Sequence, residues 1–421
     1  MKGNDMNTKE KQWANLAAEV DRRGGDGVEV VKAYQELYSI HSDKICSWLG
    51  GLYDHEIGGF YYSNSARDNE YVELDGVKHY FLPDIESTHQ ATNFLKSSGM
   101  LDSYDELPPE MTKKLIDFTC SLQSPEDGYI YHPQWGKNIK LSRRGRDMMW
   151  AVEMEEKFGF KLPYPTAIER LSTAEKYSAK KEELLAVMPE HLRSREAFLS
   201  YLNSLDWDNK AYAAGNFVAA QVMQIEAAGL MPTAIGFINS MQNPQTGTWG
   251  NKTGYDAVNA ILKISSIYQN HPIPNPMKVA MNAMDCITLP TRVETVCWQY
   301  NAWFSVRNVI QNLRKFGDNK QADEIVAEML RRAPAGIRAS ADKVKTFICD
   351  DGSYSYTPEF SSSTSQAKRV SLGLKEGDVN ATVINCTGVI YNSLKALELI
   401  DYKVKPFDKQ GLQKFLSAIR I

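Results

Sequence analysis

The stretch "SMQNPQTGTWGN", residues 240–251, raises the question that decides the fold. It follows an amphipathic run and is broken by Pro244 and Gly247, which indicate a turn. That turn also contains Trp249, although a turn has no need of a large aromatic side chain. A related stretch, "FTCSLQSPEDGYIYHP" at 118–133, has the same order of helix end, glutamine, proline, glycine and aromatic residues. The chain therefore contains an internal repeat.

Weaker copies of this repeat lie elsewhere in the chain. In each, a helical run enters a turn rich in glycine or aspartate that also carries aromatic residues. The copies are "CSWLGGLYDHEIGGFYYS" (46–63), "FLSYLNSLDWDNKAYAAG" (198–215) and "KTFICDDGSYSYTPEF" (345–360).

A second helical run follows each turn and begins with an acidic or amide residue, which suits a helix N-cap. Six such residues mark the starts: Asp84, Asp147, Asn216, Asp256, Glu294 and Asp378. The intervals from Asn216 to Asp256 and on to Glu294 are 40 and 38 residues, about the length of two helices with their loops. Longer intervals leave room for additional segments such as 64–82 and 359–376.

Nearly all the periodic segments are typical of helix, and strand-like alternation is scarce. The sequence therefore predicts an all-α chain. Six helical hairpins of this kind close naturally into a ring of inner and outer helices, an (α/α)6 toroid. We expect one large toroid domain at 45–421, with 1–44 as an N-terminal helical segment packed on it. The repeated turns would then gather at one end of the ring and set Trp249 at the mouth of a cavity.

The glutamine–glycine–tryptophan turns resemble the QW repeats of the terpenoid cyclase and prenyltransferase toroids. The hairpin arrangement is also similar to the (α/α)6 toroids of many glycoside hydrolases and polysaccharide lyases. The turns at Gln123 and Gln242 are one residue longer than the QW spacing, and of these two turns only the second supplies a tryptophan. The resemblance implies a fold, and a fold does not determine a function.

Composition narrows the classes of partner. The net charge is −4 and the isoelectric point is near 6.1, so no basic surface is expected for nucleic acid or an anionic membrane. The first dozen residues are polar and contain no secretory signal pattern, which favours a cytoplasmic location. The six cysteines and seven histidines have no zinc-site spacing, and we expect neither a metal nor a cofactor. The oligomeric state stays open.

Carboxylates at the inner-helix starts are the first candidates for catalysis. Glycoside hydrolysis needs two carboxyl groups across the bond, one protonated and one ionised. Glu86 is the first choice because it fits a capping role least, and Asp84 stands beside it in "PDIESTHQ". The remaining candidate catalytic residues are His89, Asp147, Asp256 and Asp378. For any single aspartate, helix capping is the competing interpretation. We expect Glu86→Gln to abolish turnover without lowering the melting temperature.

Aromatic residues near the turns suit the faces and hydroxyl groups of sugars, although ordinary packing explains them equally well. The aromatic candidates for substrate binding are Tyr129, Tyr131, Trp135, Trp249, Tyr255, Trp298, Tyr300, Tyr354 and Tyr356, and the polar one is Asn380. A local arginine cluster in an acidic chain could bind the carboxylate of a uronic acid, or could be a solvated loop. Its members are Arg143, Arg144 and Arg146.

Three classes of function remain open. The first, which we favour, is an enzyme that cleaves an oligosaccharide, possibly one containing uronic acid, by hydrolysis or by β-elimination. Elimination would need a base, such as His89 or a tyrosine, and a group that neutralises the uronate. The second is a terpenoid cyclase or prenyltransferase, for which no DxDD or DDxxD cluster is present. The third is a sugar-binding toroid without catalysis.

Overall fold

The computed structural model describes residues 8–170 and 188–420. Within these ranges the chain is mostly helical, and its strands are short antiparallel pairs. The predicted all-α class is therefore confirmed. None of the described helices is both long and apolar enough to span a membrane.

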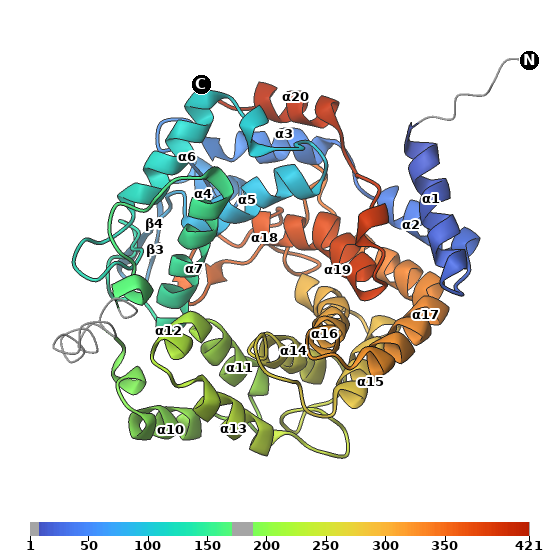
Figure 1. Ribbon diagram of the computed structural model, residues 1–421. Coiled ribbons are helices and arrows are strands. Elements are labelled where there is room, and N and C mark those ends of the chain that lie inside the picture. Colours follow the sequence, from blue (N-terminus) through green and yellow to red (C-terminus); the bar gives the residue numbers. More distant parts are fainter. Residues whose placement is uncertain (1–7, 171–187, 421) are drawn as a thin grey trace, which may run out of the picture.

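One set of helices surrounds the middle of the molecule (Figure 1), and these are called the inner helices. They are α5 (Ile85–Ser97), α7 (Leu141–Phe158), α11 (Ala211–Ala219), α12 (Val222–Ala227), α14 (Gly254–Ser265), α16 (Val296–Lys315), α18 (Val379–Thr382) and α19 (Val389–Ala396). A π-helical turn, η3 (Val383–Gly388), joins α18 to α19 without a break. Contacts run in succession from α5 through α7, α11, α14, α16 and α19, and α18 returns to α5.

The remaining long helices lie outside this set (Figure 1). They are α1 (Thr8–Arg22), α2 (Gly27–Tyr38), α3 (Lys44–Gly51), α6 (Pro109–Ser121), α10 (Arg195–Ser204), α13 (Met231–Met241), α15 (Pro276–Ile287), α17 (Asn319–Lys345) and α20 (Lys409–Ser417). Of the N-terminal pair, α2 packs on α17, and the Tyr34 hydroxyl lies 2.9 Å from the hydroxyl of Ser393. The proposed boundary near residue 44 stays a prediction.

Short elements occupy the connections. The strands pair as β1 (Tyr53–Asp54) with β2 (Gly59–Phe60), β3 (Tyr71–Leu74) with β4 (Val77–Tyr80), and β5 (Thr364–Ser365) with β6 (Lys368–Arg369). The short helical segments are α4 (Asn64–Asp68), η1 (Tyr104–Glu106), η2 (Glu190–Leu192) and η4 (Ile400–Tyr402). The additional segments expected at 64–82 and 359–376 are therefore largely hairpins and loops.

The repeated turns share one set of hydrogen bonds, which explains the glutamine. Gln242 donates its side-chain amide to Gly247 O at 3.0 Å and to Pro274 O at 2.9 Å. Gln123 does the same with Gly128 O at 3.3 Å and Tyr164 O at 2.8 Å. Each glutamine thus closes its own turn and ties that turn to the next connection along the chain.

Glycine is required in these turns because the backbone enters the left-handed region. Gly247 has φ +76° and Gly128 has φ +74°. A β-carbon at Gly128 would lie 2.3 Å from Pro165 O, and one at Gly247 would lie 2.7 Å from the Lys278 β-carbon. A larger residue would therefore both strain the turn and push its neighbour away.

Trp249 does not lie at the mouth of a cavity, where the sequence predicted it. The indole is 1 % exposed, and its N–H donates to Ile238 O at 2.9 Å. Ile238 belongs to α13, the helix that leads into the turn. Trp249 therefore anchors the turn to its own outer helix and lies in the core, with no polar atom free for a ligand.

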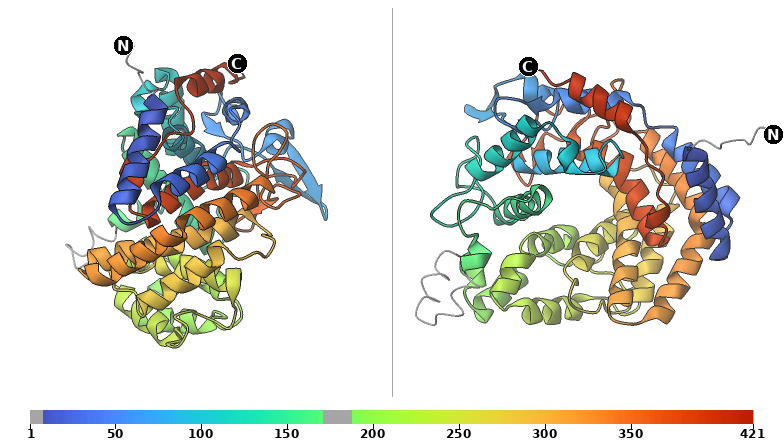
Figure 2. Two further views of the ribbon diagram at one scale, coloured as in Figure 1. Left: turned by 90° about the vertical axis from the view of Figure 1, so that its right-hand side faces the viewer. Right: turned by 45° about the horizontal axis from the view of Figure 1, so that its top comes forward.

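The starts of several inner helices are hydrogen-bonded to turns, some of them distant along the chain. The amide of Asp84 donates to Phe60 O at 3.4 Å, and the amide of Val296 donates to Tyr356 O at 3.0 Å. Ser63 and Asp378 form an isolated antiparallel bridge. The β3–β4 hairpin and the connection from α17 to α18 stand on the same side of the molecule (Figure 2, left). These bonds bring the start of α5 and the start of α18 to one end of the set.

Candidate functional site

Three predicted catalytic carboxylates meet at one guanidinium group. Arg143, on α7, is wholly buried and donates through separate nitrogens to Asp147 at 2.9 Å, Glu86 at 3.0 Å and Asp84 at 3.3 Å. The Arg143 guanidinium lies over the ring of Trp135, with its Cζ atom 4.3 Å from the ring centroid. The predicted helix start is confirmed at Asp84 and wrong at Asp147, which is the seventh residue of α7, and the arginine lies at the centre of the cluster.

Local sequence explains this arrangement. Asp84 caps α5 by accepting from the amide of Ser87 at 3.0 Å and from its hydroxyl at 2.7 Å. Asp147 lies one helical turn after Arg143, on the same face of α7. A cation so near a helix N-terminus is unfavourable against the helix dipole, and the three carboxylates compensate for it.

Burial dominates the electrostatics of this cluster. It raises the pKa of Asp147 to about 7, against the opposing charge of Arg143. His132 Nε2 accepts the amide of Ile85 at 3.0 Å, so the ring proton is on Nδ1, which lies 3.5 Å from Asp147. Burial lowers the pKa of His132 far below its usual range, which keeps the imidazole neutral. The cluster is buried, and within the described chain His132 Nδ1 and Asp147 Oδ1 have no hydrogen-bond partner.

Glu86 is held as an ionised acceptor. Burial acts to raise its pKa, but Arg146 and Arg143 outweigh burial and the pKa is lowered. Arg146 pairs with Glu86 at 2.7 Å, and the Ser365 hydroxyl donates to Glu86 at 2.8 Å. A carboxylate with three donors is poorly suited to give up or accept a proton.

One nitrogen of the Arg146 guanidinium has no hydrogen-bond acceptor in the part of the chain that the structure describes. Its side chain is 20 % exposed, and its Nε has no hydrogen-bond partner among the described residues. The guanidinium lies over the ring of Trp150, 5.6 Å from the centroid. Arg146 therefore presents an unused donor beside the buried network.

Lys263, on α14, has no hydrogen-bond acceptor among the residues that the structure describes. The side chain is half-buried, and burial, assisted by the charge of Arg146, lowers its pKa to about 8. The other described lysines with a lowered pKa each donate to an oxygen. The donors and acceptors are Lys157 to Thr92, Lys343 to Ile287, Lys368 to Asn138 and Lys403 to Ser97.

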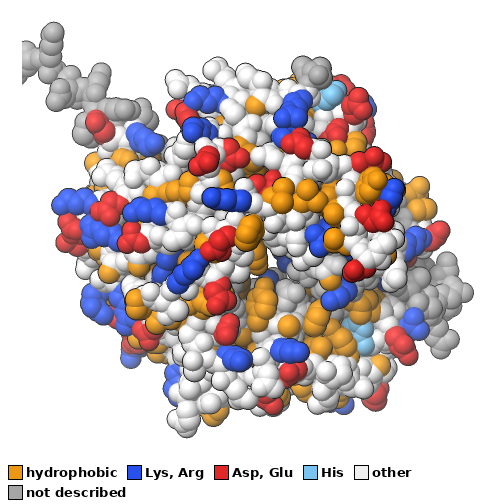
Figure 3. All heavy atoms as spheres, turned by 180° about the vertical axis from the view of Figure 1, so that it is seen from behind, with side chains coloured by type: hydrophobic (Ala, Val, Ile, Leu, Met, Phe, Trp, Pro, Cys, Tyr) orange, Lys and Arg blue, Asp and Glu red, His pale blue; other side chains and the backbone are white. Residues whose placement is uncertain are grey.

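Partly exposed side chains from neighbouring elements surround these two cations. Tyr212, on α11, is 40 % exposed, and the Lys263 ammonium lies 5.7 Å from the centroid of its ring. Cys297, at the start of α16, lies 3.6 Å from the hydroxyl of Tyr356, and both side chains are half-buried. Burial raises the pKa of Cys297, while Lys263 and Arg146 oppose that rise. Side chains from four elements therefore lie within electrostatic reach of one another, and the space between them is called here the central cavity. The face seen in Figure 3 is hollowed near its middle.

Amide side chains of the inner helices pair across helix boundaries. Gln90 donates to Asn380 at 3.0 Å, linking α5 to α18. Asn301 donates to Asn259 at 2.8 Å, linking α16 to α14. Gln90 Oε1 is buried with no partner among the described residues. The predicted residue Asn380 is half-buried and takes part in this amide lining.

Two further predicted catalytic residues are fixed in separate surroundings. His89 is 2 % exposed, pairs with Glu153 at 2.7 Å and stacks on Trp150 at 4.3 Å between centroids. Asp378 is wholly buried and caps α18 through the amide of Ala381 at 2.7 Å. Burial raises the pKa of Asp378 to about 7. Neither residue is exposed to a ligand in this conformation.

Asp256 differs from the other candidate carboxylates. It is exposed at the first turn of α14, seven residues before Lys263 and on the same side of the helix. It is the only member of the predicted catalytic set that is exposed in the structure.

The predicted aromatic residues divide into core and lining. Tyr129 and Tyr354 are wholly buried, and the Tyr354 hydroxyl bonds His41 at 2.7 Å. Tyr255 stacks on Trp298 at 4.9 Å. Tyr300 is half-buried on the side of α16 that carries Cys297.

Arg144, at the start of α7, contacts predicted aromatic residues of the loop that precedes this helix. Arg144 lies 5.5 Å from the ring centroid of Tyr129 and 5.7 Å from that of Tyr131. The Tyr131 hydroxyl donates to Asp127 at 2.7 Å. Trp135 donates its indole N–H to Arg369 O at 3.3 Å. These contacts join the loop before α7 to the β5–β6 hairpin.

No family model, curated protein or solved structure matches this chain. A function can therefore be inferred only from the residues of the site.

Sequence reasoning missed Lys263, Tyr212 and Cys297. Lys263 is the single charged residue of the apolar run "AVNAILKISSI" (257–267), and that isolation was the available signal. A lysine there either extends to solvent or is buried in an enclosed space, and only the arrangement of the helices decides between the two.

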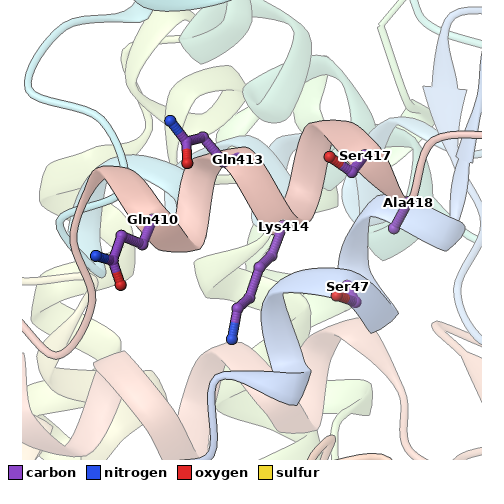
Figure 4. Close-up of a pocket in the computed structure, with 6 residues that line it drawn as sticks. All are labelled: Ser47, Gln410, Gln413, Lys414, Ser417 and Ala418. Atoms are coloured by element: carbon purple, nitrogen blue, oxygen red, sulfur yellow. The ribbon is translucent and has the colours of Figure 1, made fainter.

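The outer surface offers a less suitable site. A groove of 480 Å³ between α3 and α20 is lined by small and amide side chains (Figure 4). Its one cation, Lys414, pairs with Asp43. Among residues 8–170 and 188–420, no group of three or more potential metal ligands is present.

Proposed function

We propose that the protein is an (α/α)6 toroid that binds and cleaves an acidic oligosaccharide in its central cavity. The toroid is supported by the unbroken succession of contacts among the inner helices, which returns from α18 to α5. From α3 to α20 the outer helices alternate with inner helices or inner helix pairs, of which α11–α12 and α18–α19 are the pairs, as a repeated hairpin requires.

One observation carries the choice of an acidic ligand. Lys263 is half-buried without an acceptor, and the neighbouring Arg146 keeps an unused Nε donor. A buried charge with no partner is unfavourable, and it is found where a ligand supplies the opposite charge. A carboxylate between these two cations would satisfy both.

The amide lining favours a ligand rich in hydroxyl groups. Paired amides present both donors and acceptors, which match sugar hydroxyls and offer little to a prenyl chain. The half-buried rings of Tyr300 and Tyr356 and the exposed ring of Tyr212 add the aromatic faces that sugars use. These features favour the carbohydrate hypothesis over the terpenoid alternative.

Elimination is favoured over hydrolysis by the state of the carboxylates. Asp84, Glu86 and Asp147 are all bound to Arg143, so they do not form the accessible acid and base that hydrolysis needs. In elimination, two cations on the uronate carboxylate make its α-proton acidic. A base removes that proton, the electron pair of the broken C–H bond forms the new carbon–carbon double bond, and the C–O bond to the glycosidic oxygen breaks. An acid then supplies a proton to the departing oxygen. Burial raises the pKa of Tyr212, so its hydroxyl keeps its proton, and this exposed side chain could donate a proton to the departing oxygen.

The first experiment is incubation of the protein with a panel of neutral and uronate-containing oligosaccharides. Mass spectrometry and ultraviolet absorbance separate the outcomes: elimination gives absorbing products without a gain of water, and hydrolysis gives products that gain water. Lys263→Gln and Arg146→Gln should each weaken binding of acidic substrates by about tenfold or more. Lys320→Gln, on the exposed side of α17, is the matched control. Equal activity of all three variants would exclude the cation pair as the binding site.

Tyr212→Phe tests the proton transfer separately. It keeps the ring and removes the hydroxyl, so turnover should fall while binding of the acidic substrate stays within about twofold. Unchanged turnover would exclude Tyr212 from the chemical step.

A further inference from the structure

A second cavity lies between the C-terminal halves of α14 and α16. Its volume is 350 Å³, and its lining includes Ser265, Phe304, Arg307 and Asn308. Phe304 and Arg307 follow Cys297 at intervals that repeat the helical period, so they continue the side of α16 that faces the central cavity. This second cavity therefore adjoins the end of the ring opposite the helix starts.

Arg307 is held in place by neutral groups. Its guanidinium lies over the rings of Phe304 and Tyr391, 4.6 and 5.2 Å from their centroids. Nη1 donates to Asn392 at 2.9 Å, and Nε donates to Gln311 at 3.2 Å. Stacking and amide bonds fix the orientation of the fork while leaving its charge uncompensated.

No carboxylate pairs with Arg307 within the described part of the chain. The contrast is Arg314, two helical turns later, which pairs with Glu398 at 2.8 Å and with Asp323 at 2.6 Å. A fixed, half-buried guanidinium without an anion is the geometry that binds a carboxylate or a sulfate through two hydrogen bonds.

Tyr300 links this cation to the first pair. Burial raises the pKa of Tyr300, and Arg307 and Arg146 both act against that rise, so the hydroxyl lies within electrostatic reach of each. Ten residues of α-helix separate Cys297 from Arg307, which is a rise of about 15 Å. Arg307 thus lies beyond Cys297 toward the C-terminal end of α16, on the same side of that helix.

We propose that Arg307 forms a second anion-binding subsite, so that the cavity holds an oligosaccharide carrying acidic groups on more than one of its units. The inference rests on the proposed function for the identity of the chain that bridges the two centres. The subsite itself requires only an anionic group, supplied by a uronate carboxylate, by a sulfate ester, or by a free anion.

Isothermal titration of the full-length protein with galacturonate oligomers, from the monomer to the hexamer, tests the bridge. In the wild type, affinity should rise with length until an oligomer reaches both centres. Arg307→Gln should remove this gain, by about tenfold to a hundredfold for the hexamer, and leave monomer affinity within about twofold. Equal weakening of monomer and hexamer, or a hexamer affinity like the wild type, overturns the proposal.

Two control variants test whether weaker binding by Arg307→Gln comes from misfolding. Arg307→Lys keeps the charge and the aliphatic packing on Phe304, so it should retain part of the length dependence. Arg331→Gln removes an exposed arginine of α17 that pairs with Glu328, and it should bind every oligomer as the wild type does. Each variant is compared by melting temperature before titration.

A second arm separates this proposal from the proposed function. Inorganic sulfate is titrated at constant ionic strength into the wild type and into Arg307→Gln. Sulfate binding that depends on Arg307, with no binding of any galacturonate, keeps the anion subsite and rejects the acidic oligosaccharide. A lack of Arg307-dependent binding in both arms overturns the subsite.

Discussion

At the scale of single residues, the cation Lys263, unpaired within the described chain, is costly to the fold. The pKa of Lys263 falls from its ordinary 10.5 to about 8, so the folded protein resists protonating this side chain. A lysine with a lowered folded pKa destabilises the native state fully below that pKa, and the cost disappears as the pH passes its unfolded value.

Lys263→Met should therefore raise the free energy of unfolding at pH 7, by about 2 kcal/mol after allowance for partial exposure. The gain should shrink between pH 8 and pH 10.5, the window set by the two pKa values. Denaturant unfolding at several pH values measures it. A loss of stability at pH 7 would show that Lys263 has a structural partner. Increased stability with lost ligand binding would mark a functional residue.

Glu86 requires a change to the expectation drawn from sequence. Because it accepts from Arg143, Arg146 and Ser365, Glu86→Gln leaves buried guanidinium groups without their counter-charge. We now expect the free energy of unfolding to fall by about 3 kcal/mol, with a lower melting temperature. Glu359→Gln, which breaks an exposed pair with Arg292, is the control and should change little. An unchanged melting temperature for Glu86→Gln would contradict the network.

The sequence identified the helix starts at Asp84 and Asp378, was wrong at Asp147, and misjudged the partner of Asp84 and Asp147. Asp84 and Asp378 were recognisable as helix starts because capping is local, and both cap α5 and α18 in the structure. Arg143 was assigned to substrate binding, but it lies wholly buried among carboxylates from two helices. That meeting depends on how α5 and α7 pack, which no local pattern encodes.

At the scale of elements, Gln123 and Gln242 each bond their own turn and the next connection, and each is called here a glutamine staple. Gln242→Ala removes two donated bonds and the bond accepted from Asn275 at 2.8 Å. The free energy of unfolding should fall by about 2 kcal/mol, because buried backbone oxygens lose their partners. Gln245→Ala, an exposed glutamine in the same turn, should have no measurable effect. Equal effects of the two substitutions would contradict the staple.

The repeat in these turns predicted their local structure but not the orientation of Trp249. The match between the Gln123 and Gln242 stretches predicted equivalent local structures, and both form the same pair of bonds. The direction in which Trp249 points could not be inferred, since a tryptophan suits a cavity mouth and a core equally. The hairpins within 64–82 and 359–376 were missed because their strands are only two to four residues long.

At the scale of the whole molecule, the first and last inner helices depend on each other. α18 contacts α5, and Gln90 of α5 bonds Asn380 of α18 across nearly 300 residues of chain. The outer connections add bonds between the same ends, such as Val379 N to Tyr62 O at 2.9 Å. An element missing at either end would expose apolar faces on both sides of the gap.

We expect thermal unfolding to follow one transition, with the same midpoint by circular dichroism and by tryptophan fluorescence. A chain shortened to end at Glu376, which lacks α18 to α20, should show no cooperative transition. Two separate midpoints in the full chain, or cooperative unfolding of the shortened one, would indicate independent units. The predicted succession of hairpins came from the repeats, whereas the closing contact joins distant segments that share no motif.

The glutamine staples have a consequence for how such a chain could evolve. Gln242 bonds Pro274 and Gln123 bonds Tyr164, so each staple begins in one hairpin and ends in the connection that follows. A duplicated segment would carry the glutamine of its own turn and would receive a new acceptor from whatever came next. Gene duplication could therefore lengthen the array one hairpin at a time, and a deletion would be tolerated only when it removed a whole hairpin.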